Sequence, residues 1–204
     1  MTSFPSRRRS TSTPFWRSRK LTRPIFKVDV DDVCADLISE WVRRYNEAWG
    51  DNLTPANIIY WNLANCVKPE CGQQVYDILR QPDLYDNVRP IPGAKWGVEQ
   101  LRRIGRVVFV TAVVPGTLDA KLEWLYRNGF ITRDSDFIAA KDKSLVDGDV
   151  LIDDAPHNHP DILFSRTHNQ GFHHPFRVYD WDEIVSLTTR LFDTSGMRRA
   201  YGNL

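Results

Sequence analysis

The sequence predicts an α/β domain whose parallel sheet is covered by helices on both faces, and three observations support this fold class. Short apolar runs alternate with longer segments in which apolar residues recur at helical spacing. The short runs are apolar almost throughout, as in strands that are buried on both sides. The chain of 204 residues is 42% hydrophobic and 12% aromatic, which is typical of a folded chain and not of a disordered one. We therefore expect an open parallel sheet flanked by helices.

The first part of the chain is expected to supply one strand and then only helices. Residues 25–30 form an apolar run that ends in acids, and they are expected to be a buried strand. Apolar residues then recur at helical spacing up to residue 49. Thr54-Pro55 is typical of a helix start, because Thr caps the first turn and Pro fits its first position. Helices are therefore expected at residues 37–49, 54–63, 71–81 and 94–104, the last of them ended by Gly105.

The second part of the chain returns to the alternation of strands and helices. A helix is expected after Pro115, and an amphipathic helix is expected near the end of the domain. The strands are expected at residues 106–111, 136–140, 149–153 and 176–179, and the helices at 116–128 and 181–192. Because helices alone fill residues 37–96, we expect that stretch to be a small cap inserted after the first strand. The core then comprises residues 25–36 and 97–195, with an arm at 1–24 and a tail at 196–204.

The net charge of +1 is the sum of two unlike parts. Residues 1–24 hold seven of the 27 basic residues and no acid, which leaves 20 bases against 26 acids, or −6, for the remainder. Such an arm fits an organellar transit peptide, a disordered segment that contacts nucleic acid, or sequence added upstream of a natural start. Nucleic-acid contact is thus expected only through the arm. No apolar stretch approaches the length of a membrane span, so a cytoplasmic protein is expected, or an organellar one if the arm is a transit peptide.

Cysteine and histidine residues are not spaced as in a zinc motif. The three cysteines are an odd set in a mid-sized chain, so we expect free or buried thiols in a reducing compartment. Five histidines lie between residues 157 and 174 without metal-site spacing. His157-Asn158 could instead orient the nearby acids from behind.

Acidic residues follow two of the predicted strands at the point where each strand ends. Asp29, Asp31 and Asp32 follow the first strand, and Asp153-Asp154 end a later one. Ligands of open parallel sheets bind beyond the carboxyl ends of the strands. Carboxylates that meet there repel one another, and a hard divalent cation such as Mg²⁺ relieves the repulsion. Thr111, at the end of another strand, and Lys143 would suit a phosphate group beside that cation.

The order of these groups resembles a known family. Asp29 to Val33, Thr111, Lys143 and Asp153-Asp154 match in order the four motifs of the haloacid dehalogenase (HAD) superfamily. Residues 29–36, 89–94 and 151–154 look closest to its 5'(3')-deoxyribonucleotidase branch. The resemblance covers about residues 25–185, and it implies a HAD-like, Rossmann-type sheet with a small helical cap.

The resemblance also implies roles for individual residues. Asp29 would attack phosphorus and form an aspartyl-phosphate, while Asp31 would protonate the leaving oxygen and later activate water. Mg²⁺ would be held by Asp29, the backbone carbonyl of Asp31 and Asp154, with Asp153 in support. The phosphoryl group would be bound by Thr111, Ala112 and Lys143.

The chain departs from the branch at two positions near this site. Asp32 stands where the branch often has Gly, so it could cap a helix or alter metal affinity. Pro115 stands where the animal enzymes carry a phosphate-contacting Lys. The next lysine, Lys121, is expected one or two turns into the following helix, which would lower phosphate affinity. Lys141 could contribute instead, although an exposed surface lysine is the simpler interpretation.

The cap is expected to select the substrate. Trp61 on a cap helix could stack on a base, with packing in the cap core as the alternative. The prediction is a Mg²⁺-dependent phosphomonoesterase that acts on (deoxy)nucleoside monophosphates and forms a homodimer. Two alternatives stay open: a HAD phosphatase for another small phosphoester or a nucleic-acid 3'-phosphate end, and a catalytically silent nucleotide- or nucleic-acid-binding protein.

Overall fold

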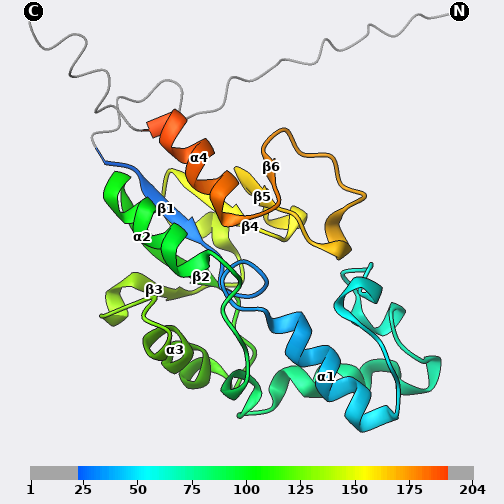
Figure 1. The fold of residues 1–204 in the computed structure, drawn as a ribbon. Helices are drawn as coiled ribbons and strands as arrows, with labels where there is room; N and C mark the ends of the chain where they lie inside the picture. The colour runs from blue at the N-terminus through cyan, green and yellow to red at the C-terminus, as the bar shows by residue number, and fades with distance from the viewer. Residues whose placement is uncertain (1–22, 193–204) are drawn as a thin grey trace, which may run out of the picture.

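The computed structural model describes residues 23–192 and contains one open sheet of six parallel strands (Figure 1). The predicted α/β fold with a parallel sheet is therefore confirmed. The predictions for the tail and for all but the last two residues of the arm lie outside the described residues. The strands are β1 (Ile25–Val28), β2 (Arg106–Thr111), β3 (Phe137–Ala139), β4 (Val150–Asp153), β5 (Ile162–Phe164) and β6 (Arg177–Val178).

The strand order is β3-β2-β1-β4-β5-β6, which places β1 at the centre of the sheet. Val28 near the end of β1 pairs with Phe109 of β2 on one side and with Ile152 of β4 on the other. The chain leaves β1 toward β2 and β3 and later returns to β4 on the opposite side. Sheets of this order open a crevice where the direction reverses, here between β1 and β4. The residues after these two strands therefore share one crevice.

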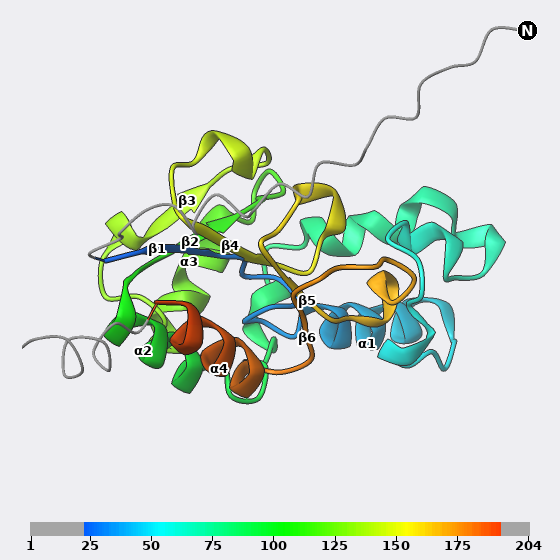
Figure 2. The same ribbon diagram turned by 90° about the horizontal axis from the view of Figure 1, so that it is seen from above.

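Two helices lie side by side on one face of the sheet (Figure 2). They are α2 (Ala94–Ile104) and α4 (Trp181–Phe192), both with the predicted bounds. Gly97 allows their close approach, because a Cβ atom there would lie 2.2 Å from the Trp181 ring. The indole nitrogen of Trp181 donates a buried 2.9 Å hydrogen bond to the carbonyl oxygen of Val33. The last helix thereby holds the loop that follows β1.

The predicted cap lies beyond the carboxyl end of β1 and begins with α1 (Leu37–Trp49) (Figure 1). Its inner face is aromatic: Trp41 and Tyr45 are fully buried and stack with ring centroids 5.5 Å apart. The Trp41 indole also donates a 3.1 Å hydrogen bond to the Val75 carbonyl. The predicted boundary after residue 96 falls inside α2, and the division into cap and core stays a prediction. No helix within residues 23–192 combines the length and apolarity needed to span a bilayer.

The helix predicted at residues 54–63 is wrong. Only two short 3₁₀ turns form there, η2 (Pro55–Asn57) and η3 (Leu63–Asn65). The side chain of Asn57 accepts hydrogen bonds from Thr54, and the side chain of Asn62 accepts one from the backbone of Ala64. Such local side-chain bonds compete with the helical ladder and end each turn.

Three other elements differ from the prediction in detail. Residues 71–81 do become helical, but as the 3₁₀ helix η4 (Pro69–Arg80), which is interrupted where Gly72 takes a φ of 51°. The helix expected from residue 116 is α3 (Leu118–Arg127), and it begins later because Gly116 takes a φ of 89°. Strand β5 was not predicted, since three residues are too few to show a period.

Candidate functional site

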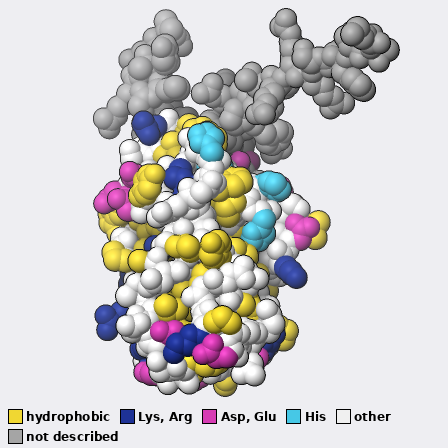
Figure 3. Space-filling view, turned by 90° about the vertical axis from the view of Figure 1, so that its right-hand side faces the viewer, with side chains coloured by type: hydrophobic (Ala, Val, Ile, Leu, Met, Phe, Trp, Pro, Cys, Tyr) yellow, Lys and Arg dark blue, Asp and Glu magenta, His cyan; other side chains and the backbone are white. Residues whose placement is uncertain are grey.

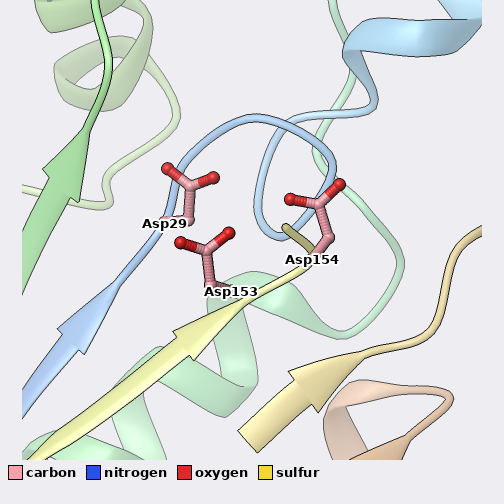
Figure 4. A group of neighbouring side chains, drawn as sticks. All are labelled: Asp29, Asp153 and Asp154. Carbon is pink, nitrogen blue, oxygen red and sulfur yellow. The ribbon is translucent and has the colours of Figure 1, made fainter. Parts of the chain in front are cut away.

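Three acidic side chains meet between the ends of β1 and β4 (Figure 4). Asp29 follows β1, Asp153 ends β4 and Asp154 follows it, and oxygens of the three carboxylates lie within 4.8 Å of one another. All three residues are buried. The crevice predicted from the strand order therefore holds the acids that the sequence placed at the strand ends.

Lys143 binds two of these acids from one side. Its ammonium lies 2.7 Å from Asp29 Oδ1 and 2.7 Å from Asp153 Oδ2. Burial alone would lower the pKa of Lys143, but the carboxylates of Asp29 and Asp153 outweigh it and raise the pKa. Lys143 therefore stays charged. Fully ionised, the three acids and the ammonium would leave two negative charges in a buried space. Burial, with Asp153 and Asp29 adding to it, accordingly raises the pKa of Asp154 in the absence of a cation. A donor set of buried carboxylate oxygens with this charge fits a hard divalent cation.

Both carboxylate oxygens of Asp153 accept hydrogen bonds from neighbouring protein groups. Its Oδ2 accepts hydrogen bonds from Lys143 and, at 2.8 Å, from the side chain of Asn158. Its Oδ1 accepts a 2.9 Å bond from the backbone nitrogen of Ala155. Asn158, from the pair predicted to orient the acids, is thus in contact with one of them.

Asp31 lies on the other side of the crevice, between a lysine and a tyrosine that the sequence did not assign to the site. Its Oδ2 is 2.7 Å from the ammonium of Lys121, and its Oδ1 accepts a 2.6 Å bond from the hydroxyl of Tyr85. Lys121 also donates to Thr111 Oγ1 at 3.0 Å and to the Ala112 carbonyl at 2.7 Å. It lies about one turn into α3, as expected, but its side chain reaches back into the site. Its helical spacing to the buried Trp124 was the available signal.

Asp32 takes a backbone conformation that favours glycine. Its φ of 53° lies in the left-handed region, which glycine adopts without strain. Its Oδ1 accepts a 3.1 Å hydrogen bond from the backbone nitrogen of Ile38. Asp32 therefore caps the first turn of α1, which is one of the two roles expected for it from the sequence. Burial, with Asp154 adding to it, raises the pKa of Asp32 to about 8. Asp32 therefore adds little charge at neutral pH.

A cavity of about 360 Å³ opens above the acids, and its two ends differ in chemistry. Asp29, Asp31, Asp154, Thr111, Ala112, Lys141 and Lys143 line the polar end. The other end is lined by apolar cap residues, which are Leu37, Ile38, Ile58, Tyr60, Trp61, Leu63, Tyr76 and Leu79. Figure 3 shows one face of the molecule, on which hydrophobic side chains gather with histidine side chains beside them. The cavity has the size of a small-ligand site.

Trp61 belongs to the wall of this cavity and not to the cap core. Its side chain is 53% exposed, and it lies between η2 and η3 instead of on the predicted helix. The ring makes edge-to-face contacts with His157 at 4.7 Å and with His168 at 5.1 Å. Both histidines belong to the core, so Trp61 joins the cap to the core across the cavity.

Comparisons with known proteins found a family and several individual proteins that this chain resembles. The family described as 5' nucleotidase, deoxy (pyrimidine), cytosolic type C protein matches residues 23–192. A 5'(3')-deoxyribonucleotidase of Clostridium acetobutylicum is 34% identical over 178 residues, which span 85% of this chain and 99% of that protein. A 5'(3')-deoxyribonucleotidase of Bacillus subtilis is 30% identical over 169 residues, spanning 79% and 96%. A solved haloacid dehalogenase-like family hydrolase from Xanthomonas campestris aligns with a TM-score of 0.49 and 15% identity over 86% of this chain and 98% of that one.

Proposed function

Since the chain belongs to the 5' nucleotidase, deoxy (pyrimidine), cytosolic type C family, we propose that it is a Mg²⁺-dependent phosphomonoesterase of (deoxy)nucleoside monophosphates. One observation carries the proposal: the buried carboxylates and Lys143 form the floor of a cavity whose far wall is aromatic. A phosphate at the polar end and a base at the apolar end would match the two chemistries of this cavity.

The proposed reaction has two steps. In the first, an oxygen of Asp29 attacks phosphorus, the bond from phosphorus to the ester oxygen breaks, and Asp31 gives that oxygen a proton. In the second, water attacks the aspartyl-phosphate and gives a proton to Asp31, which releases phosphate and restores Asp29. Lys121, 2.7 Å from Asp31, would stabilise the carboxylate that Asp31 becomes between the two steps.

The phosphoryl oxygens would be bound by cationic and polar groups at the floor of the cavity. Lys143 supplies a charged donor, Thr111 a hydroxyl and Ala112 its backbone, and all three line the polar end. A Mg²⁺ ion held by Asp29, the Asp31 carbonyl and Asp154 would draw charge from the same oxygens.

The substrate would be selected at the cap end of the cavity. The exposed rings of Tyr60 and Trp61 offer faces on which a base can stack. Lys141 lines the same cavity, near the acids, and could bind a phosphate or a sugar oxygen there.

A phosphate-release screen tests the substrate class. It compares ribo- and deoxynucleoside 5'- and 3'-monophosphates with sugar phosphates and 3'-phosphorylated oligonucleotides. Preference for a mononucleotide supports the proposal. Preference for a sugar phosphate or an oligonucleotide end favours another phosphoester. Nucleotide binding without any phosphate release favours a silent binding protein.

Two further measurements test the mechanism. Asp29→Asn should abolish phosphate release while the melting temperature stays near that of the wild type, and turnover retained by this variant would exclude Asp29 as the nucleophile. Asp182→Asn is a matched control, because Asp182 is exposed on α4. EDTA should inhibit and Mg²⁺ should restore activity. Undiminished hydrolysis in EDTA would contradict the proposed metal.

A further inference from the structure

The segment after β5 supports the acidic cluster from behind. Two of its residues, Arg166 and Asn169, anchor the backbone there, and they lie in a stretch that includes the 3₁₀ turn η9 (Thr167–Asn169). Arg166 Nε donates a 2.6 Å bond to the Asp32 carbonyl, and Asn169 Nδ2 donates a 2.7 Å bond to the Asp154 carbonyl. Asn169 is itself fixed by Arg177, which donates to its side-chain oxygen at 2.8 Å. This segment therefore holds the backbone on both sides of the crevice.

His168 of the same segment approaches the side chain of Asp154. Its Nε2 lies 2.9 Å from Asp154 Oδ2, and the nitrogen is shielded from solvent. The distance is that of a hydrogen bond, but Nε2 has no partner aligned for one in this arrangement. The carboxylate favours the tautomer that carries its proton on Nε2.

The His168 ring is also held on its outer side. Trp61 packs edge to face against it at 5.1 Å, and the side chain of His168 is only 7% exposed. A ring that is packed in this way can fix the direction of the group it contacts. Asp154 Oδ2 would accept a hydrogen bond from the His168 ring, which leaves Asp154 Oδ1 free to bind a cation.

We propose that His168 is a positioning residue that orients the Asp154 carboxylate toward the divalent cation. The inference rests on the metal site of the proposed function and extends it to a residue outside the four motifs. Groups that hydrogen-bond to metal ligands typically contribute 10- to 100-fold to metal affinity. His168 would act through Asp154 and would not touch the substrate.

The test measures Mg²⁺ binding to the full chain by isothermal titration calorimetry without substrate. His168→Phe keeps an aromatic ring against Trp61 but removes the nitrogen, and it should weaken Mg²⁺ binding about 10-fold or more. His168→Gln places an amide nitrogen near the position of Nε2 and should restore most of the affinity. His157→Phe is the matched control, because His157 packs on the same Trp61 ring at 4.7 Å. It should stay within about twofold of the wild type, since the described contacts of His157 include no carboxylate of the cluster.

The outcomes separate this proposal from the proposed function. Equal Mg²⁺ affinity of folded His168→Phe and the wild type would overturn the role of His168 and leave the proposed function standing. A wild type that binds no Mg²⁺ would overturn both. Equal losses in His157→Phe and His168→Phe would assign the effect to packing on Trp61 and would also count against the proposal. If His168→Phe does not fold, His168→Met carries the same test, because it too lacks a donor.

Discussion

Replacing Lys121 by Met should slow the reaction without weakening substrate binding. An ammonium has three N–H donors, and those of Lys121 are used by Asp31, the Thr111 hydroxyl and the Ala112 carbonyl. None remains for a phosphate oxygen. Lys121 therefore acts by holding the proposed acid–base residue and the phosphate-binding loop in one arrangement. Met has a similar length and keeps the apolar packing, so the variant removes the charge with little change in shape.

The size of the effect follows from the contacts that are lost. A hydrogen bond to a charged group contributes about 1.5–3 kcal/mol, and the Asp31 contact at 2.7 Å is the one closest to the chemistry. If that loss falls on the transition state, kcat should fall by about 10- to 150-fold, because 1.36 kcal/mol corresponds to a factor of ten. KM should stay within about threefold of the wild type, since no donor to the substrate is removed.

Steady-state kinetics with a nucleoside monophosphate measures both constants. Lys95→Met is the control, because Lys95 is exposed on α2. An unchanged kcat in folded Lys121→Met would refute the positioning argument. A large rise in KM at constant kcat would show instead that Lys121 binds the phosphate directly.

Three other predictions concern the cap and the loop beneath it. Trp61→Ala should raise KM for nucleotides about 2- to 12-fold at unchanged stability, and an unchanged KM would remove Trp61 from the substrate site. Burial alone would raise the pKa of Glu40, but hydrogen bonds from Arg43 and Arg44 outweigh it and lower the pKa. The ionised carboxylate of Glu40 therefore stabilises the fold above its ordinary pKa of 4.5, and this contribution is lost as the pH falls through the lower pKa of the folded state. Glu40→Gln should therefore cost about 1–3 kcal/mol in urea unfolding at pH 7 and much less near pH 3; an equal loss at both pH values would contradict this. Asp32→Gly should change the free energy of unfolding by less than about 1 kcal/mol, because glycine relieves the backbone strain of the left-handed conformation and so offsets the lost cap of α1. A loss above about 2 kcal/mol would show that the cap dominates.

The sequence is sufficient to predict a site residue when the position of that residue follows from the strand that it ends or follows. Asp29, Thr111 and Asp153 each follow or end an apolar run, so their meeting at one edge of a parallel sheet could be predicted. Lys121 could not be assigned, because its place in the site depends on the direction in which a helix side chain points. His168 could not be assigned either, since it is brought to Asp154 by the unpredicted strand β5.

Trp61 shows a different limit of the prediction. Trp61 lines the cavity, and its contact with a substrate stays a prediction, but the helix predicted around it does not form. The helix-start signal of Thr54-Pro55 carried that prediction. The side chains of Asn57 and Asn62, which bond to nearby atoms, decide the backbone there instead. Local hydrogen bonding by asparagine is thus a better guide than the Thr-Pro start signal in this stretch.

The loop after β1 is fastened by residues far along the chain, and this has a consequence for the order of folding. Val33 is bound by Trp181, 148 positions later, and the Asp32 carbonyl by Arg166, 134 positions later. Contacts between such distant residues form late, because a long loop must close first. During synthesis the first acids of the site are made early, yet they acquire their final geometry only once α4 has emerged and docked. The site is therefore a marker of complete folding, and a chain that stops before residue 181 should fail to assemble it.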